Sequence, residues 1–181
     1  MRIRYVTTDV FTDRRFGGNQ LAVFPDARQI PHELMLPIAR EFNYSETTFV
    51  FPPNDPKHTR RVRIFTPERE IPFAGHPTVG TAHILAHLKE VPLTGPVTRV
   101  VFEEGVGPVP VAIHAQGGTP SFCQLSVAKL PEFGAPPPSR AALAEMLSLQ
   151  ADDLTEGEFA SQSVSCGLPF LFVPLRDRAA V

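Results

Sequence analysis

Hydrophobic residues in the first 130 positions fall into short runs separated by turn-rich segments. Residues 2–11 are rich in the strand-favouring types Ile, Tyr, Val and Thr, and a second apolar run at 21–24 is closed by Pro25. Similar patterns predict a loop at 14–19, strands at 46–51, 60–66 and 121–128, and a hairpin over 98–115 that turns at 104–108. We therefore expect much of this region to form a sheet.

Two segments of the same region predict helices, and the second helix is unusually apolar. Residues 31–42 place Pro31 in the first turn, where proline is tolerated, but Pro37 should kink or shorten the helix. Residues 76–88 form the second segment, and positions 79–88 are apolar on every side apart from two histidines and a threonine. A helix that is apolar all round is buried. We therefore expect an α+β fold in which a sheet curls around this central helix.

The pattern changes at residues 130–139 (LPEFGAPPPS), which are dense in proline and glycine and predict a linker. Beyond them the chain predicts a short helix at 140–149 and strands at 159–165 and 169–173. We expect residues 1–128 to form one lobe, and residues 129–181 to form the linker and the incomplete start of a second lobe. Roughly 50 residues are marginal for an independent hydrophobic core.

Composition adds limits on the partners of the chain. Hydrophobic residues make up 43% and charged residues 20%, and the formal net charge of −2 gives no electrostatic reason to expect nucleic acid or an anionic membrane as partner. No apolar run approaches the ~20 residues that span a bilayer, and the N-terminus lacks a secretory signal. Cys123 and Cys166 lie far apart without metal-binding spacing, which favours a reducing, cytoplasmic setting.

The segment GHPTVGT (75–81) raises the question of an anion site. Its glycine spacing is that of a phosphate loop, but Thr81 occupies the position of the essential lysine, which argues against a nucleotide. The unpaired N–H groups at the helix start could still bind a carboxylate. The alternative is that Gly75 only allows a tight turn into the helix, and the local sequence leaves both interpretations open.

Metal binding and cysteine chemistry find little support. His83 and His87 have the spacing of a helical metal pair, but no third ligand accompanies them, so we predict no metal site. Neither Cys123 nor Cys166 has an electropositive surround in the sequence, so we expect both to be packed residues rather than nucleophiles.

Glu46 is the acid with the most informative position. It stands in FNYSETTFVF (42–51), at the start of a predicted strand, and alternation puts it on the same face as Thr48 and opposite Phe49. An acid that enters an apolar strand is either exposed at the strand end or shifted in pKa and used in catalysis. The local pattern does not choose between these two interpretations.

Four ordered blocks together resemble the PhzF family, the phenazine-biosynthesis-type isomerases. They are DVFTDRRFGGNQLAVF (9–24), AREFNYSETTFVF (39–51), RIFTPEREIPFAGHPTVGTAHIL (63–85) and CGLPFLFVPL (166–175). The resemblance implies a diaminopimelate epimerase-like fold with two lobes, each a β-barrel-like sheet wrapped around a central helix, and an active site between them. It is also compatible with a homodimer.

The same resemblance implies which residues form the site. Glu46 would be the acid–base residue and His76 a second catalytic residue, while Asn19, Ser45, Gly75 and Pro77 would line the substrate. The implied reaction moves a proton on a small carboxylate-bearing substrate without a cofactor. Thiol epimerases place cysteines at the starts of their central helices, and the Gly75-His76 pair here disfavours that chemistry.

Two departures from the family pattern leave a second hypothesis open. Gln20 replaces a proline that many relatives carry, which we expect to be mild, and nothing in 1–181 matches the Gly-Ser-Ala turn that completes the cleft from the second lobe. Without that lobe we expect the half-site to be too wet to raise the pKa of Glu46. The alternative to an isomerase is thus a catalytically silent binding or interaction protein, or an inactive fragment.

Overall fold

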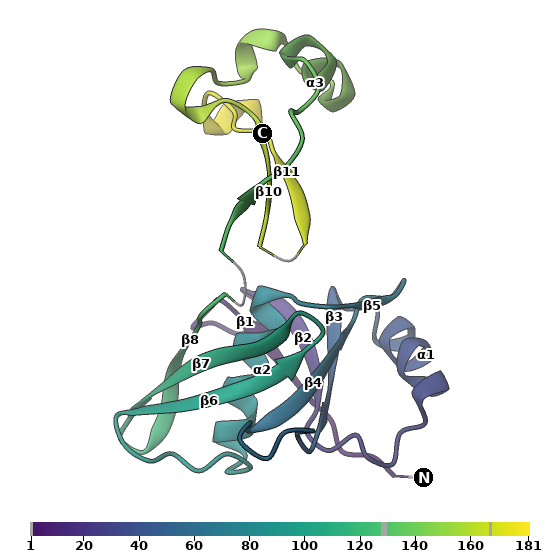
Figure 1. The fold of residues 1–181 in the computed structure, drawn as a ribbon, viewed down its shortest axis with the longest axis vertical. Helices are drawn as coiled ribbons and strands as arrows, with labels where there is room; N and C mark the ends of the chain where they lie inside the picture. The colour runs from purple at the N-terminus through teal and green to yellow at the C-terminus, as the bar shows by residue number, and fades with distance from the viewer. Residues whose placement is uncertain (1, 128–129, 167) are drawn as a thin grey trace. The chain divides into compact units, whose positions relative to one another are not determined.

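The computed structural model describes residues 2–127, 130–166 and 168–181, which separate into two compact units, unit 1 (1–128) and unit 2 (129–181) (Figure 1). Unit 1 comprises β1 (Val6–Val10), β2 (Asn19–Phe24), α1 (His32–Phe42), β3 (Glu46–Phe51), β4 (Arg60–Phe65), β5 (Glu70–Ile71), α2 (Gly75–His87), β6 (Val97–Glu104), β7 (Gly107–Gln116) and β8 (Thr119–Leu125). Unit 2 comprises β9 (Glu132–Phe133), α3 (Arg140–Leu147), β10 (Gln162–Ser165) and β11 (Pro169–Phe172), with short 3-10 turns at Ala151–Asp153, Gly157–Phe159 and Arg178–Ala180.

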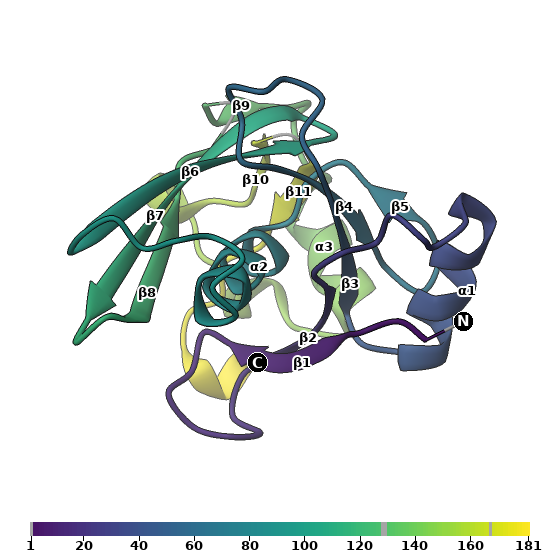
Figure 2. The same ribbon diagram turned by 90° about the horizontal axis from the view of Figure 1, so that it is seen from below.

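The sheet of unit 1 curls around α2 as a half-barrel. Its strands follow the order β1-β2-β3-β4-β6-β7-β8, with β5 attached to β4, and Figure 2 shows them arranged around α2. Every α2 residue from His76 to Ala86 except His83 is buried, as the all-round apolar pattern predicts. The expected α+β fold with a sheet wrapped around a central helix is therefore confirmed.

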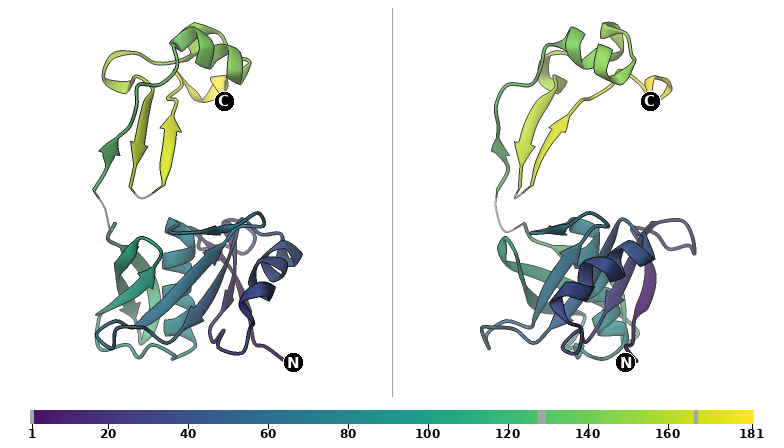
Figure 3. Two further views of the ribbon diagram at one scale, coloured as in Figure 1. Left: turned by 45° about the vertical axis from the view of Figure 1, so that its right-hand side comes forward. Right: turned by 90° about the vertical axis from the view of Figure 1, so that its right-hand side faces the viewer.

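The two faces of the sheet carry separate cores. On the inner face, Thr48 of β3 lies 2.9 Å from Thr81 of α2 (Oγ1 to Oγ1), whereas Phe49 packs into a second cluster with Met35 and Ala39 of α1. Figure 3 shows α1 beside the sheet on the side away from α2. Because strand side chains alternate between faces, this places Glu46 on the α2 side, as the sequence indicates.

Several local predictions need correction. Pro37 does not shorten α1, which runs to Phe42. The linker prediction for 130–139 is wrong in part, because Glu132–Phe133 pairs with β10. The strand predicted at 159–165 begins only at Gln162, after a 3-10 turn. The predicted strand end Ala128, and Gly167 of the C-terminal block, lie outside the described residues.

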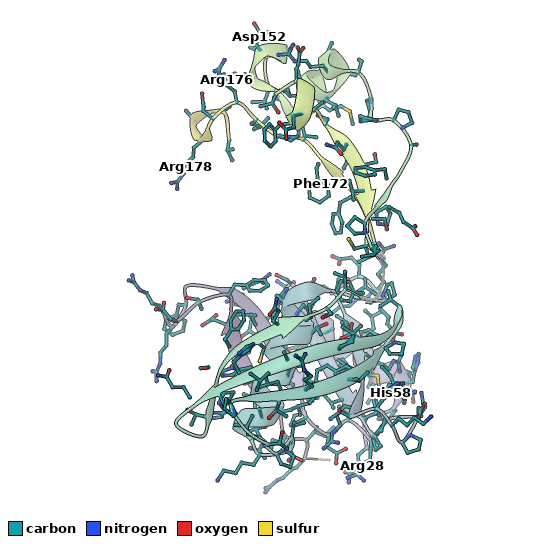
Figure 4. The ribbon with its side chains drawn as sticks, turned by 60° about the vertical axis from the view of Figure 1, so that its left-hand side comes forward. Arg28, His58, Asp152, Phe172, Arg176 and Arg178 are labelled. Atoms are coloured by element: carbon teal, nitrogen blue, oxygen red, sulfur yellow. The ribbon has the colours of Figure 1, made fainter. Side chains whose placement is uncertain are left out.

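Unit 2 has few buried apolar side chains among its described residues. Leu143, Ala144 and Leu154 form its small cluster. Large apolar side chains on the hairpin stay exposed, including Phe170 and Phe172, which is labelled in Figure 4. Since buried apolar area is the main favourable term in folding, unit 2 has a weaker core than unit 1.

We expect backbone amides of β10 and β11 to exchange with solvent faster than those of α2 and β6, because local opening is easier where few apolar contacts must break. Amide hydrogen exchange followed by mass spectrometry on the intact chain measures this directly. Equal or stronger protection in unit 2 would show that its core is more stable than its burial indicates.

Candidate active site

The candidate site lies where two strand starts meet the start of α2. Asn19 begins β2 and Glu46 begins β3, and the two strands pair in parallel with Leu21 opposite Glu46. Parallel strands place their starts at the same edge of the sheet. Ser45 precedes β3, and His76 is the second residue of α2, so these residues come together from three segments.

Glu46 and His76 form the centre of the site. Glu46 Oε2 lies 3.2 Å from His76 Nε2, and the two side chains are 16% and 7% exposed. Both atoms are inaccessible to water, and within the described residues neither has a partner with hydrogen-bond geometry. The distance is therefore short, but the alignment is that of two facing groups rather than of a formed hydrogen bond.

A chain of hydrogen bonds orients the imidazole of His76. Ser45 Oγ donates to Asn19 Oδ1 over 3.0 Å, which turns the amide nitrogen of Asn19 towards His76. That nitrogen, Nδ2, lies 3.2 Å from His76 Nδ1 and donates to it. A neutral imidazole that accepts at Nδ1 carries its proton at Nε2, so in the tautomer that accepts from Asn19 the proton of His76 lies on the nitrogen facing Glu46.

Burial moves the pKa values of both groups towards neutral forms. Desolvation raises the pKa of the Glu46 carboxyl above 4.5. Desolvation also lowers the pKa of His76 below 6.5, and a hydrogen bond with the Gln20 backbone opposes this in part. A neutral carboxyl and a neutral imidazole are the forms that a water-poor site favours. From the sequence, a site without the second lobe is expected to be too wet to raise the pKa of Glu46. That expectation is wrong, because burial raises the pKa of this carboxyl in the present chain.

The start of α2 offers backbone donors beside this pair. Its N-cap residue, Ala74, makes no side-chain capping bond, and the first turn holds no acidic residue. Gly75 and His76 supply free N–H groups, whereas Pro77 has none to satisfy. No atom lies within 4 Å of a Cβ built on Gly75, so the glycine leaves open space there. This arrangement fits an anion such as a carboxylate.

Phe11 is a residue at this site that the sequence analysis did not single out. It follows β1 with a positive φ of 63° and is 76% exposed. Its ring lies 6.4 Å from the His76 ring in an edge arrangement. The apolar end of a predicted strand gave no signal for this role, because only the fold brings the strand end to the helix start.

A separate cavity of about 370 Å³ lies between β1, α2 and β8. Phe11, His83 and Cys123 are among its lining residues, and Glu46 and His76 are not. Burial raises the pKa of the Cys123 thiol to about 12, so the thiol stays protonated at neutral pH and is a poor nucleophile. The sequence-based expectation that Cys123 and Cys166 are not catalytic stays a prediction.

Two curated isomerases are similar in sequence to this chain. An uncharacterized isomerase of Mesorhizobium japonicum is 41% identical over 176 residues, which are 97% of this chain and 57% of that protein. A trans-2,3-dihydro-3-hydroxyanthranilate isomerase of Pseudomonas aeruginosa is 40% identical over 122 residues, 67% of this chain and 41% of the enzyme. The chain thus spans about half the length of the curated relatives it matches.

Solved structures include the same fold. A predicted epimerase from Pseudomonas aeruginosa superposes with a TM-score of 0.82 at 35% identity, over 96% of this chain and 60% of that one. No helix in the described part of the chain is long and apolar enough to cross a membrane. The family model for phenazine biosynthesis-like proteins matches residues 8–181. The chain therefore belongs to the PhzC-PhzF family.

Proposed function

We propose that this chain carries the acid–base centre of a cofactor-independent isomerase or epimerase that acts on a small carboxylate-bearing molecule. The observation that carries the proposal is the buried pair of Glu46 and His76, 3.2 Å apart, beside an uncapped helix start. Perturbed ionisable groups at such a position are typical of catalytic acids and bases. The relatives named as isomerases support the reaction class.

Glu46 performs the proton transfer in this proposal. Its carboxylate takes a proton from a substrate carbon, and the neutral carboxyl then returns that proton to a different carbon on the same face of the substrate. The bonding electrons of the C–H bond stay in the substrate throughout, so the step is redox-neutral. A raised pKa of Glu46 suits both the removal and the return of the proton, because the same carboxyl must accept and donate near neutral pH.

The start of α2 holds the substrate in this proposal. A substrate carboxylate would accept from the N–H groups of Gly75 and His76, where the helix dipole favours negative charge. Asn19 and Ser45 fix the His76 proton on Nε2, next to the reacting carboxyl. The His76 side chain therefore shapes the site and presents its Nε2 towards the carboxyl of Glu46.

Replacing His76 by alanine should lower turnover by about 10²-fold and also raise KM, because it removes the side chain that faces Glu46 and widens the site at the helix start. Steady-state kinetics on a confirmed substrate measure both effects. His83→Ala, two turns along the same helix, is the matched control and should keep near-normal values. Equal changes of turnover and KM in the two variants would show that His76 has no specific role in the site.

A screen for solvent deuterium incorporation tests the proposal as a whole. The protein is incubated in D₂O with small amino and hydroxy acids, and mass spectrometry detects exchanged C–H positions. Exchange that disappears in Glu46→Gln supports the isomerase. Saturable binding of such acids without exchange would instead support the silent binding protein that the sequence leaves as the alternative.

A further inference from the structure

A second buried carboxyl lies beneath the start of α2. Glu104, the last residue of β6, is 8% exposed, and its Oε1 lies 2.7 Å from Oγ1 of Thr78. Thr78 is fully buried, and its Oγ1 also lies 2.8 Å from the carbonyl oxygen of Ala74. Ala74 is the N-cap residue of α2 and precedes Gly75 and His76 directly. Three oxygens thus form a chain that ends at the backbone of the candidate site.

The number of protons available to these three oxygens depends on whether the Glu104 carboxyl is protonated. The Thr78 hydroxyl has one proton, yet it lies within hydrogen-bond distance of two other oxygens. If Glu104 is ionised, both neighbours of the hydroxyl are acceptors, and the single Thr78 proton is donated to one of them or shared between the two. If Glu104 is neutral, its carboxyl proton goes to Thr78, and Thr78 donates to Ala74. Only the neutral form gives each of the two short contacts a proton of its own.

The surroundings of Glu104 favour the same state. Its Oε2 is inaccessible to water and has no hydrogen-bond partner within the described residues. Burial raises the pKa of this carboxyl to about 7, and the bond to Thr78 lowers it in part. No ion pair joins Glu104 to another described residue. Three titratable groups on its own or neighbouring elements face other residues: Glu70 of β5 pairs with Arg63, Glu103 of β6 pairs with His58, and His76 of α2 faces Glu46.

Backbone packing fixes Glu104 against the segment that leads into α2. A Cβ on Gly105 would lie 2.6 Å from the Cα of Pro72, so the turn after β6 approaches this segment too closely for any other residue. The Val106 N–H donates to the Pro72 carbonyl over 3.1 Å. Both Glu104 and Ala74 are therefore within two residues of a tightly packed backbone contact, which brings the carboxyl and the start of α2 close together.

We propose that Glu104 donates a carboxyl proton to Thr78 and, through it, holds the Ala74 carbonyl, so that Glu104 is a positioning residue for the start of α2. The hydrogen bonds of Glu104, Thr78 and Ala74 require no assumption about activity. Their effect on catalysis rests on the proposed function. When the Glu104 carboxyl loses its proton, the hydrogen bond that it donates to Thr78 is lost, and a buried negative charge is left without a partner ion. The helix start that carries Gly75 and His76 then loses its fixed position.

The effect on stability has a definite sign. The pKa of Glu104 is higher in the folded chain, about 7, than its ordinary value of 4.5. Stability from the neutral carboxyl is complete below the ordinary value and is lost as the pH rises towards the folded value. Glu104→Gln keeps a donor for Thr78 but cannot ionise, so the melting temperature of the variant should rise relative to the wild type between pH 5 and pH 8.

Carbon-13 NMR of glutamate side-chain carboxyls in the intact chain tests the proton directly. We expect one resonance, absent in Glu104→Gln, to titrate with a midpoint near 7, and it should persist in Glu46→Gln. A midpoint near the ordinary value of 4.5 would overturn the proposal. This measurement needs no substrate, so it succeeds or fails independently of the proposed function.

The positioning role is tested by the amide resonances of Gly75 and His76. In the wild type they should shift between about pH 6 and pH 8 with the midpoint of Glu104, and in Glu104→Gln this shift should vanish. Thr78→Val breaks the chain without touching the carboxyl and should place both amides near their high-pH positions already at pH 6, whereas Thr78→Ser should behave like the wild type. If the amide chemical shifts of Gly75 and His76 change neither with pH nor in Thr78→Val, Glu104 does not position the start of α2.

Discussion

Glu46→Gln should slow proton exchange on a confirmed substrate by about 10²–10⁴-fold, which corresponds to about 3–5 kcal/mol in the barrier. Glutamine has the size of glutamate and keeps a polar group facing His76, but it cannot accept and return a proton at neutral pH. The helix start with its free N–H groups is unchanged, so substrate binding should persist. Rates of deuterium incorporation and KM values for the two proteins separate the two effects.

Folding provides the control for this variant. Burial raises the pKa of Glu46, so the ionised carboxyl costs stability above its ordinary pKa of 4.5 and not below it. Glu46→Gln should therefore melt at the same or a higher temperature than the wild type at neutral pH. Glu41→Gln, an exposed acid on α1, should change neither rate nor stability. Near-normal exchange in Glu46→Gln would leave Glu46 with a purely structural role.

Phe102→Ala should lower the free energy of unfolding of unit 1 by about 3–5 kcal/mol. Phe102 lies on β6, is 0% exposed, and belongs to the core cluster that contains Val79 and Leu85 of α2. Truncation to alanine leaves a cavity between the sheet and the helix that the closely packed surroundings cannot fill. A loss of this size is a large part of the stability of an ordinary domain.

Urea unfolding followed by circular dichroism measures this change, with the transition of unit 1 assigned through the amide exchange of α2. Phe122→Ala, on β8 and 58% exposed, is the matched control and should cost less than about 1 kcal/mol. Equal losses at the two positions would contradict a core built around α2.

The central helix was predictable from sequence because its apolar character is continuous. A buried helix shows this pattern on every side, so residues 76–88 indicate burial, and the strands predicted on both sides of them in the sequence indicate the surrounding sheet. The two-residue strands β5 and β9 were not predictable, because two residues show no periodicity and Phe133 owes its strand to pairing with β10. Tertiary pairing decided these elements.

In the candidate site, too, some residues were predictable from the sequence and others were not. Glu46 and His76 stand in distinctive blocks, and the family resemblance names them, but no spacing in the chain indicates that their side chains lie 3.2 Å apart. The positions of Phe11 and Glu104 depend on a strand end and a hairpin end that approach α2 only in the folded chain. The sequence shows which residues carry chemistry, whereas burial and pKa shifts arise from the fold.

Titration of the Glu46 and His76 side chains by NMR in the intact chain tests the proton-transfer centre most directly, because it requires neither a substrate nor turnover. We predict that Glu46 titrates above 4.5 and His76 below 6.5, as burial of both groups dictates. The midpoint of His76 should also change in Glu46→Gln, since the two side chains face each other across 3.2 Å. Ordinary midpoints for both groups, with no response of His76 to the variant, would contradict a buried acid–base pair at the start of α2.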